Sequence, residues 1–192
     1  MSSSSNENKI KQEELYKQWK LASPYRKDDC LKAVKQLQEL SNTDIAHDEK
    51  MLQAIKIVQD KLNLYHLAIY FVQGDWLVLY GGAGESIERM LARGTKREIK
   101  ANYGIVGHVA ATQEMRCFWD LSPDIHLYFE GPDLADAKSE IAFPLLAKGK
   151  LIGVMDLQSI FHCDFREEEY EAFQLLVTEV ANIFSVRFEN RI

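Results

Sequence analysis

Residues 104–112 read Gly-Ile-Val-Gly-His-Val-Ala-Ala-Thr, and two later stretches, 139–145 and 151–159, read Ser-Glu-Ile-Ala-Phe-Pro-Leu and Leu-Ile-Gly-Val-Met-Asp-Leu-Gln-Ser. The first stretch alternates small and apolar residues in the manner of a short helix, and its two glycines allow a tight backbone turn. The two later stretches are rich in strand-forming residues, and Lys148-Gly149 between them is typical of a compact hairpin. Together they predict a short helix followed by a pair of antiparallel strands.

The same reading extends to the rest of the chain. Strands are predicted at 64–72, 76–80, 87–92, 115–121, 140–147 and 150–158, and helices at 7–21, 28–40, 51–62 and from Tyr170 onward. Asp164 and Glu167 form a capping-box-like pair before the last helix, and Pro144 predicts an edge or irregular strand position. Runs of strands flanked by helices indicate an α+β fold with the helices gathered on one face of the sheet.

These blocks, in this order and with Asp120 after a strand and Phe165 before the closing helix, resemble the GAF domains, which are small sensory modules related to PAS domains. The resemblance covers residues 44–188. It implies a six-stranded antiparallel sheet with the first and last helices on one face and a small-molecule pocket on the other. Residues 1–43 are then a disordered tip and N-terminal helices, 44–185 the GAF domain, and 186–192 the start of a helix leading to an output domain.

The block at 104–112 has two readings. Its first turn can offer free N–H groups and a positive helix end to an anionic ligand group, or its glycines serve close packing of helix and sheet. The resemblance favours a pocket wall, and the loop from Ser122 to Ser139 is a natural lid. Asp156 ends an apolar strand, where an acid needs a partner if it is buried. The candidate ligand contacts are Ile105, Val106, Gly107, Asp120, Ser122, His126, Tyr128, Asp133, Ser139 and Asp156.

The segment before the last helix bears on the kind of ligand. In GAF domains that bind cyclic nucleotides, an acid at the position of Asp156 faces the pocket, and the block at 104–112 is similar to their phosphate-facing segment. The signature of phosphodiesterase GAF domains is only partly present. Its Asn-Lys pair falls on Ser159-Ile160, its Phe and Asp positions fall on His162 and Arg166, and its Glu is retained at Glu167. A cyclic nucleotide such as cAMP or cGMP is the leading ligand.

Composition limits the function classes. The 192 residues include 23 Lys and Arg against 29 Asp and Glu, a net charge of −6, which argues against a nucleic-acid surface. No apolar run approaches the roughly 18 residues that span a bilayer, and the polar start has no features of a signal peptide. Three widely spaced cysteines suggest neither a disulfide framework nor a zinc site. A cytoplasmic protein without a metal is the expectation.

Two alternatives to a sensor stay open. The free methionine sulfoxide reductases are GAF-type enzymes with cysteine chemistry, but the places where they carry cysteines hold Val106 and the 133–138 stretch here. A ligand-free dimerisation scaffold is the other alternative. The favoured reading is a non-catalytic sensor without a cofactor other than the cyclic nucleotide. It is expected to control an attached cyclase, kinase or phosphatase, and to form a homodimer through its N- and C-terminal helices. An apolar stripe at Leu31, Val34, Leu37 and Leu40 is a plausible seam for a partner helix.

Overall fold

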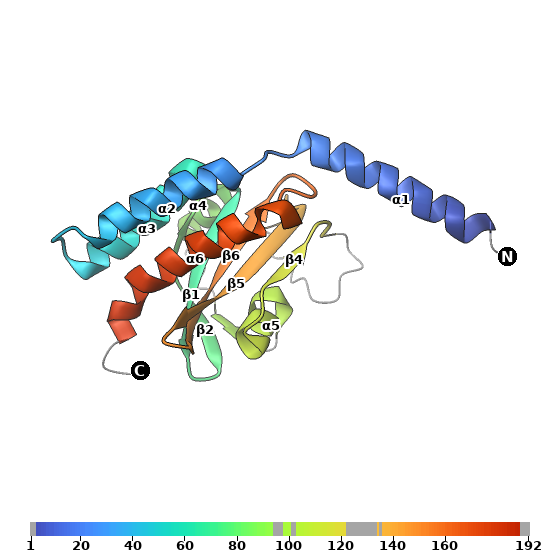
Figure 1. Cartoon of the computed structure of the whole chain (residues 1–192). Helices are drawn as coiled ribbons and strands as arrows, with labels where there is room; N and C mark the ends of the chain where they lie inside the picture. The colour runs from blue at the N-terminus through green and yellow to red at the C-terminus, as the bar shows by residue number, and fades with distance from the viewer. Residues whose placement is uncertain (1–2, 94–97, 101–102, 122–133, 135, 189–192) are drawn as a thin grey trace.

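The computed structural model describes residues 3–93, 98–100, 103–121, 134 and 136–188 (Figure 1). The elements in chain order are α1 (Ser3–Ala22), α2 (Lys27–Ser41), α3 (His47–Leu62), β1 (His66–Gln73), β2 (Trp76–Ala83), α4 (Glu85–Ala92), β3 (Glu98–Lys100), α5 (Gly104–Thr112), β4 (Arg116–Phe118), β5 (Ser139–Ala147), β6 (Lys150–Ser159) and α6 (Tyr170–Ser185), with 3₁₀ turns η1 (Glu167–Glu169) before α6 and η2 (Val186–Phe188) after it.

The six strands form one antiparallel sheet in the order β3-β2-β1-β6-β5-β4. Both hairpins predicted from the sequence are confirmed: β1 pairs with β2 around Gly74, and β5 pairs with β6 around Gly149. β4 pairs with β5 from Glu140 to Ala142 and ends before Pro144, so the proline stands where β5 has no neighbour on that side among the described strands. Its missing N–H therefore costs no ladder hydrogen bond there.

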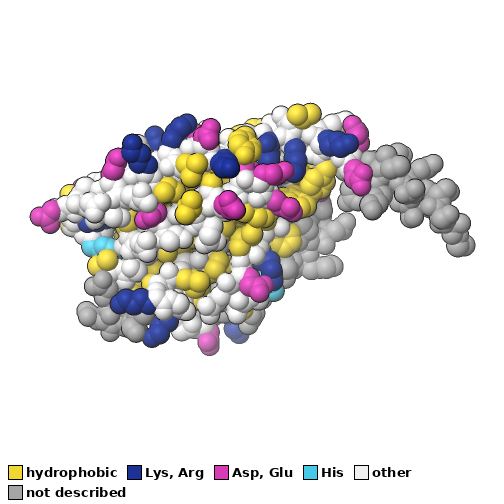
Figure 2. Space-filling view, in the orientation of Figure 1, with side chains coloured by type: hydrophobic (Ala, Val, Ile, Leu, Met, Phe, Trp, Pro, Cys, Tyr) yellow, Lys and Arg dark blue, Asp and Glu magenta, His cyan; other side chains and the backbone are white. Residues whose placement is uncertain are grey.

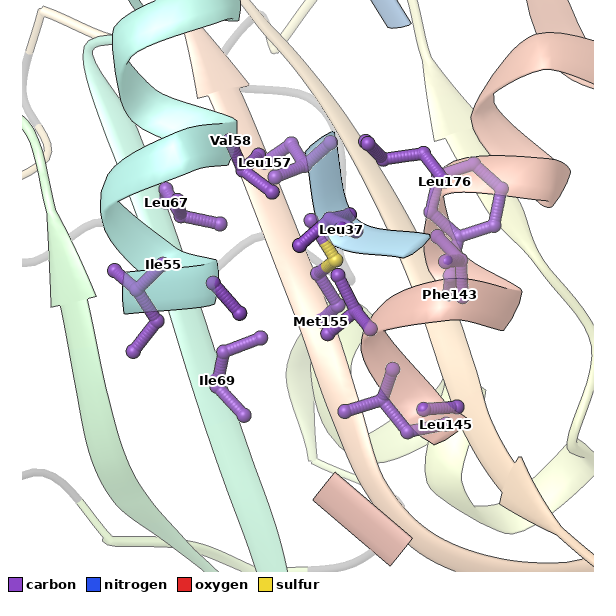
Figure 3. Close-up of a cluster of buried hydrophobic side chains, with 14 of the residues drawn as sticks. Leu37, Ile55, Val58, Leu67, Ile69, Phe143, Leu145, Met155, Leu157 and Leu176 are labelled. Carbon is purple, nitrogen blue, oxygen red and sulfur yellow. The ribbon is translucent and has the colours of Figure 1, made fainter. Parts of the chain in front are cut away.

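Each of the central strands is covered on both faces. Along β1, Leu67 and Ile69 point to the face covered by α2, α3 and α6, whereas Ala68 and Tyr70 point to the face covered by α4 and α5, because successive side chains alternate. The expected GAF arrangement is thereby confirmed, with the first and last long helices of the domain on one face and short helices on the other. Figure 3 shows the core under the long helices, with Leu37, Ile55, Val58, Leu67, Ile69, Phe143, Leu145, Met155, Leu157 and Leu176 labelled.

The apolar stripe of α2 finds most of its contacts within the chain. Leu37 and Leu40 are buried in the core beside α3 and α6, Val34 is half-buried, and Leu31 is 41% exposed. The seam that the sequence predicts is therefore largely filled by helices of the same chain. Leu31 is the member of the stripe that stays at the surface.

Two local predictions are wrong. Residues 87–92 form the helix α4 rather than a strand, and the third short strand of the sheet is instead β3. The N-terminus of the last helix is also capped differently: the capping box joins Arg166 and Glu169, while Asp164 accepts two hydrogen bonds from Arg26. Asp164 is fully buried by this pairing.

Helix α1 extends away from the sheet (Figure 1), and its C-terminal part contacts the segments that follow β4 and β6. The Trp19 ring stacks on His162 with 4.2 Å between centroids, and Tyr16 meets Trp119 edge-on at 5.1 Å. Stacked and edge-on aromatic pairs each contribute about 0.5–1.5 kcal/mol beyond their burial. These contacts orient α1 against the segment that leads from β6 to α6.

Candidate ligand-binding cavity

A cavity of about 270 Å³ lies on the α5 side of the sheet. Its walls are mostly apolar, with Trp76 from β2, Ile99 from β3, and Ile105 and Val106 from α5. Glu98, Lys100 and Tyr103 are exposed and lie at its open end. A mostly apolar cavity with a few convergent polar groups is the usual form of a small-molecule site.

The buried end of the cavity is polar because of the strand register. Gln158 on β6 stands opposite His66 on β1 and Glu140 on β5, so three polar side chains lie in one row across neighbouring strands. Asp156 lies one step along β6 on the same face, between Ala68 and Ala142. The two alanines leave space in front of the carboxylate. We call Glu140, Asp156 and Gln158 the cavity floor.

The floor residues are hydrogen-bonded to one another. Nε2 of Gln158 lies 3.2 Å from Glu140 Oε2 and 3.1 Å from Asp156 Oδ2. Asp156 Oδ2 is also 3.3 Å from Nε2 of His66, whose Nδ1 lies 2.6 Å from the Ser86 hydroxyl at the start of α4. All five side chains are at most 2% exposed. Such a network fixes the orientation of each member.

Two acceptor atoms of the floor have no partner among the residues that the structure describes. They are Oδ1 of Asp156 and Oε1 of Gln158, and both are buried. Buried polar atoms are nearly always hydrogen-bonded, and leaving one without a partner costs about 1–3 kcal/mol. These two atoms therefore mark the place where a ligand would complete the network.

The N-terminus of α5 forms another part of the wall. Gly104 has a φ of +65°, which glycine adopts without strain, and it turns the chain into the helix directly beside the cavity. The residue before it, Tyr103, makes no side-chain cap hydrogen bond to the helix. Without that cap, the first N–H groups of α5 can serve an anionic group or water.

Only some of the ligand contacts predicted from the sequence lie at the cavity. Ile105, Val106 and Asp156 line the cavity, whereas Gly107 is buried in α5 and is not part of the described lining. Asp120 is half-buried and lies 3.4 Å from His162, and the Ser139 hydroxyl donates to the carbonyl of Phe161 at 2.7 Å. The remaining candidates, Ser122, His126, Tyr128 and Asp133, lie outside the described residues.

Sequence reasoning missed Glu140, Gln158 and His66. A usable signal was present, since each is a polar residue at a position of its strand whose alternation points to the core. What the pattern alone lacks is the register that puts them in one row. The register follows from pairing both β1 and β5 with β6.

A larger depression of about 1390 Å³ lies between α3, α4 and the part of β2 beyond β3. It is open, and its charged side chains Lys56, Asp60, Glu85 and Glu88 are exposed. Its buried polar lining residues are Arg26, which is hydrogen-bonded to Asp164 and Leu62, and Ser159. Unlike the cavity floor, they do not form a hydrogen-bonded row with one another among the described residues, although Oε1 of Gln59 is a buried acceptor without a described partner. We therefore take the smaller cavity as the candidate site.

The three cysteines lie away from the cavity, whose described lining contains none of them. Burial raises the pKa of Cys30 to about 12 and that of Cys117 to about 12, and it also raises the pKa of Cys163. A thiol must ionise to act as a nucleophile, so burial disfavours thiolate chemistry at these positions. No group of three or more metal-ligating side chains occurs in the described part of the chain.

Strand order, register and cavity define an α+β domain with a candidate ligand site, and the sequence comparison identifies its family. The family model of the GAF domain matches residues 45–185, so the chain belongs to the GAF domain family. No protein among the curated sequences matches it. Among the described helices, none is long and apolar enough to cross a bilayer.

Solved structures show the same fold at low sequence identity. A GAF sensor protein from Burkholderia vietnamiensis is similar at 21% identity and a TM-score of 0.66, covering 82% of this chain and 94% of that one. The GAF domain of a phosphoenolpyruvate-protein phosphotransferase from Coxiella burnetii is similar at 19% identity and a TM-score of 0.69, and the match covers 88% of this chain and 100% of that one. A free methionine-R-sulfoxide reductase from Neisseria meningitidis, solved with its substrate, is similar at 20% identity and a TM-score of 0.63. That match covers 87% of this chain and 93% of the reductase.

Proposed function

We propose that this GAF domain is a non-catalytic regulatory module that binds a cyclic nucleotide in the cavity beneath α5. The observation that carries the proposal is the pair of buried acceptors without described partners, Asp156 Oδ1 and Gln158 Oε1, at the end of an otherwise apolar cavity. In this arrangement the base lies between Ile99 and Val106 with its N–H groups on the floor. The phosphate lies toward the uncapped first turn of α5.

The ligand acts by a shift of populations between two packings of the domain. The β6–α6 segment carries the change to the terminal helices, because Asp164 in that segment holds Arg26 at the start of α2 through two hydrogen bonds of 2.9 and 2.6 Å. Movement at the end of β6 thereby reaches the helices that join an attached output domain. The domain is thus proposed as the regulatory part of a signalling protein.

The helical face supports a homodimer as the signalling unit. α2 and α6 lie side by side, with Gln38 donating to Glu179 at 2.8 Å, and Leu31 and Leu175 are 41% and 52% exposed. Figure 2 shows hydrophobic side chains among charged ones over this face. Light scattering tests the dimer: we expect dimeric mass for the wild type and monomeric mass for the Leu31→Glu/Leu175→Glu variant. A monomeric wild type at high concentration would contradict the arrangement.

Thermal shift against cGMP, cAMP and other nucleotides tests the ligand. A ligand at a hundred times its Kd adds about 2.7 kcal/mol, which raises the Tm of a chain of this length by about 5–11 °C. We expect the shift to be lost in Asp156→Asn and kept in Asp120→Asn, because Asp120 lies outside the cavity. If no nucleotide raises the Tm, or if both variants respond equally, the proposal is wrong.

A reductase is the competing function, and the site offers it less support. The similarity to a methionine sulfoxide reductase concerns the fold, and the described cavity lining has no cysteine. Replacing all three cysteines with serine should leave nucleotide binding intact. Turnover of free methionine sulfoxide by the wild type, lost in that variant, would establish the reductase instead.

A further inference from the structure

The Gln158 carboxamide is held in one orientation by two carboxylates. Its nitrogen carries two N–H donors, and Nε2 lies within hydrogen-bond distance of both Glu140 Oε2 and Asp156 Oδ2, at 3.2 and 3.1 Å. Turning the amide over would bring its oxygen against two carboxylate oxygens, which repel it. The assignment of oxygen and nitrogen therefore follows from the neighbours, as it should for a buried amide.

The consequence is a floor that offers acceptors. Because both donors of Gln158 are used, the amide presents Oε1, and Asp156 presents Oδ1 beside it on the same face of β6. Gln158 is 2% exposed and Asp156 is fully buried, so the two acceptors are shielded from bulk water. Among the described residues, the other charged or titratable groups are Glu140 within the floor, His66 and Tyr70 beside it on β1, and Glu98, Lys100 and Tyr103 at the open end.

We propose that the cavity selects ligands by a pair of adjacent hydrogen-bond donors on a flat edge, as in an amidinium, a guanidinium or the N–H edge of guanine, attached to a flat apolar body. The donors bind Asp156 Oδ1 and Gln158 Oε1, and the body packs against Ile99, Ile105 and Val106. This selectivity rests on the proposed ligand-binding function. Among cyclic nucleotides it favours cGMP, because the corresponding edge of adenine has one donor and one acceptor.

The expected difference in affinity follows from the cost of placing a ligand acceptor against an acceptor of the floor. A ligand that places an acceptor against Oε1 or Oδ1 leaves two buried acceptors facing each other without a proton between them. An unsatisfied buried group of this kind lowers affinity about 10–100-fold. Benzamidine and benzamide are suitable probes because they share size and shape, while benzamide has an acceptor oxygen where benzamidine has a second donor nitrogen and a positive charge.

The experiment measures both Kd values on the full chain by calorimetry or by chemical-shift titration. We expect benzamidine to bind at least about 10-fold more tightly than benzamide. The ratio should fall to near 1 in Asp156→Asn and in Gln158→Met, each checked for native unfolding behaviour. Glu98→Gln is the matched control: it removes one negative charge at the open end and should keep the ratio. Equal binding of the two probes, or a ratio that falls equally in Glu98→Gln, overturns the proposal.

The nucleotides separate this inference from the function on which it rests. If cGMP binds at least about 10-fold more tightly than cAMP, the two-donor rule is supported. If cAMP binds more tightly than cGMP, the domain is still a nucleotide sensor and the two-donor rule is overturned. If neither nucleotide nor either probe binds, the proposed function itself fails, and the selectivity falls with it.

Discussion

Asp164→Asn should strongly destabilise the domain, although it replaces only one carboxylate oxygen by an amide nitrogen. The Asp164 carboxylate is fully buried and accepts hydrogen bonds of 2.9 and 2.6 Å from two nitrogens of Arg26, which is 6% exposed. Arg26 also donates to the carbonyl of Leu62 at the end of α3, and its backbone N–H donates to Glu169. The amide keeps the volume of the acid but leaves the guanidinium without a counter-charge.

The size of the effect comes from that buried charge. Removing one partner of a buried ion pair costs about 3–5 kcal/mol, because the remaining charge stays desolvated. For a chain of this length each kcal/mol lowers the Tm by about 2–4 °C, so we expect a loss of about 6–20 °C. Urea unfolding should give the same free energy, with an unchanged m-value.

Two further variants decide whether the reasoning holds. Glu168→Gln makes the same chemical change at the exposed pair between Glu168 and Lys20, where N and O are 3.3 Å apart, and should cost less than about 1 kcal/mol. The double variant Arg26→Met/Asp164→Leu removes both buried charges and should recover most of the stability. If Asp164→Asn loses no more than Glu168→Gln, or if the double variant is the least stable of the three, the argument from buried charge is refuted.

Three more outcomes follow from the same structure. Burial raises the pKa of Cys117 to about 12, so little of this thiol is ionised at pH 8. Iodoacetamide should therefore alkylate Cys117 about 10³-fold more slowly in the native than in the unfolded protein, as measured by peptide mass spectrometry. Similar rates in the two states would contradict this. Ala at Gly153 would place its Cβ 2.2 Å from the carbonyl of Tyr70, so Gly153→Ala should cost about 2–3 kcal/mol in urea unfolding, and a neutral effect would show that the strands part easily. Trp19→Ala removes the stacking on His162 and should raise the rate of proteolytic cleavage within α1 while the domain core stays protected. An unchanged cleavage rate would mean that this stacking does not hold the helix in place.

The sequence predicted the architecture because the decisive signals are local. Both hairpins, α5 and the amphipathic α3 and α6 follow from periodicity and turn residues within a few positions. The error at 87–92 had a local remedy: Ile87, Met90 and Leu91 are spaced as on a helix, and two acids stand in its first turn after Gly84. β3 has three residues and pairs only with the start of β2 among the described strands, which is too short a pattern to detect.

The interactions that the sequence could not reveal join distant segments. Arg26 and Asp164 are 138 positions apart, and a capping residue was the reasonable local role for Asp164. In the structure Asp164 pairs with Arg26 instead, and the capping box is formed two residues later in the sequence, by Arg166 and Glu169. In the same way the acid at Asp156 was visible, whereas the polar row of Gln158, Glu140 and His66 beside it depends on how three strands are aligned.

The composition of that row is itself an argument for binding. Along the same face, the next rows of the sheet hold Tyr70, Val154 and other apolar residues, so the fold has no general need for polar groups there. Replacing buried charged groups by apolar residues of similar volume is often neutral or stabilising. A chain selected for stability alone would have little reason to keep Asp156 and Gln158 buried beneath α5, each with an acceptor that has no partner among the described residues. Positions that depart from the packing rule in this way are those where function is expected. Leucine at Asp156, Gln158, Glu140 and His66 together removes the whole polar network without leaving a buried partner behind, and should therefore keep the domain about as stable while removing its binding.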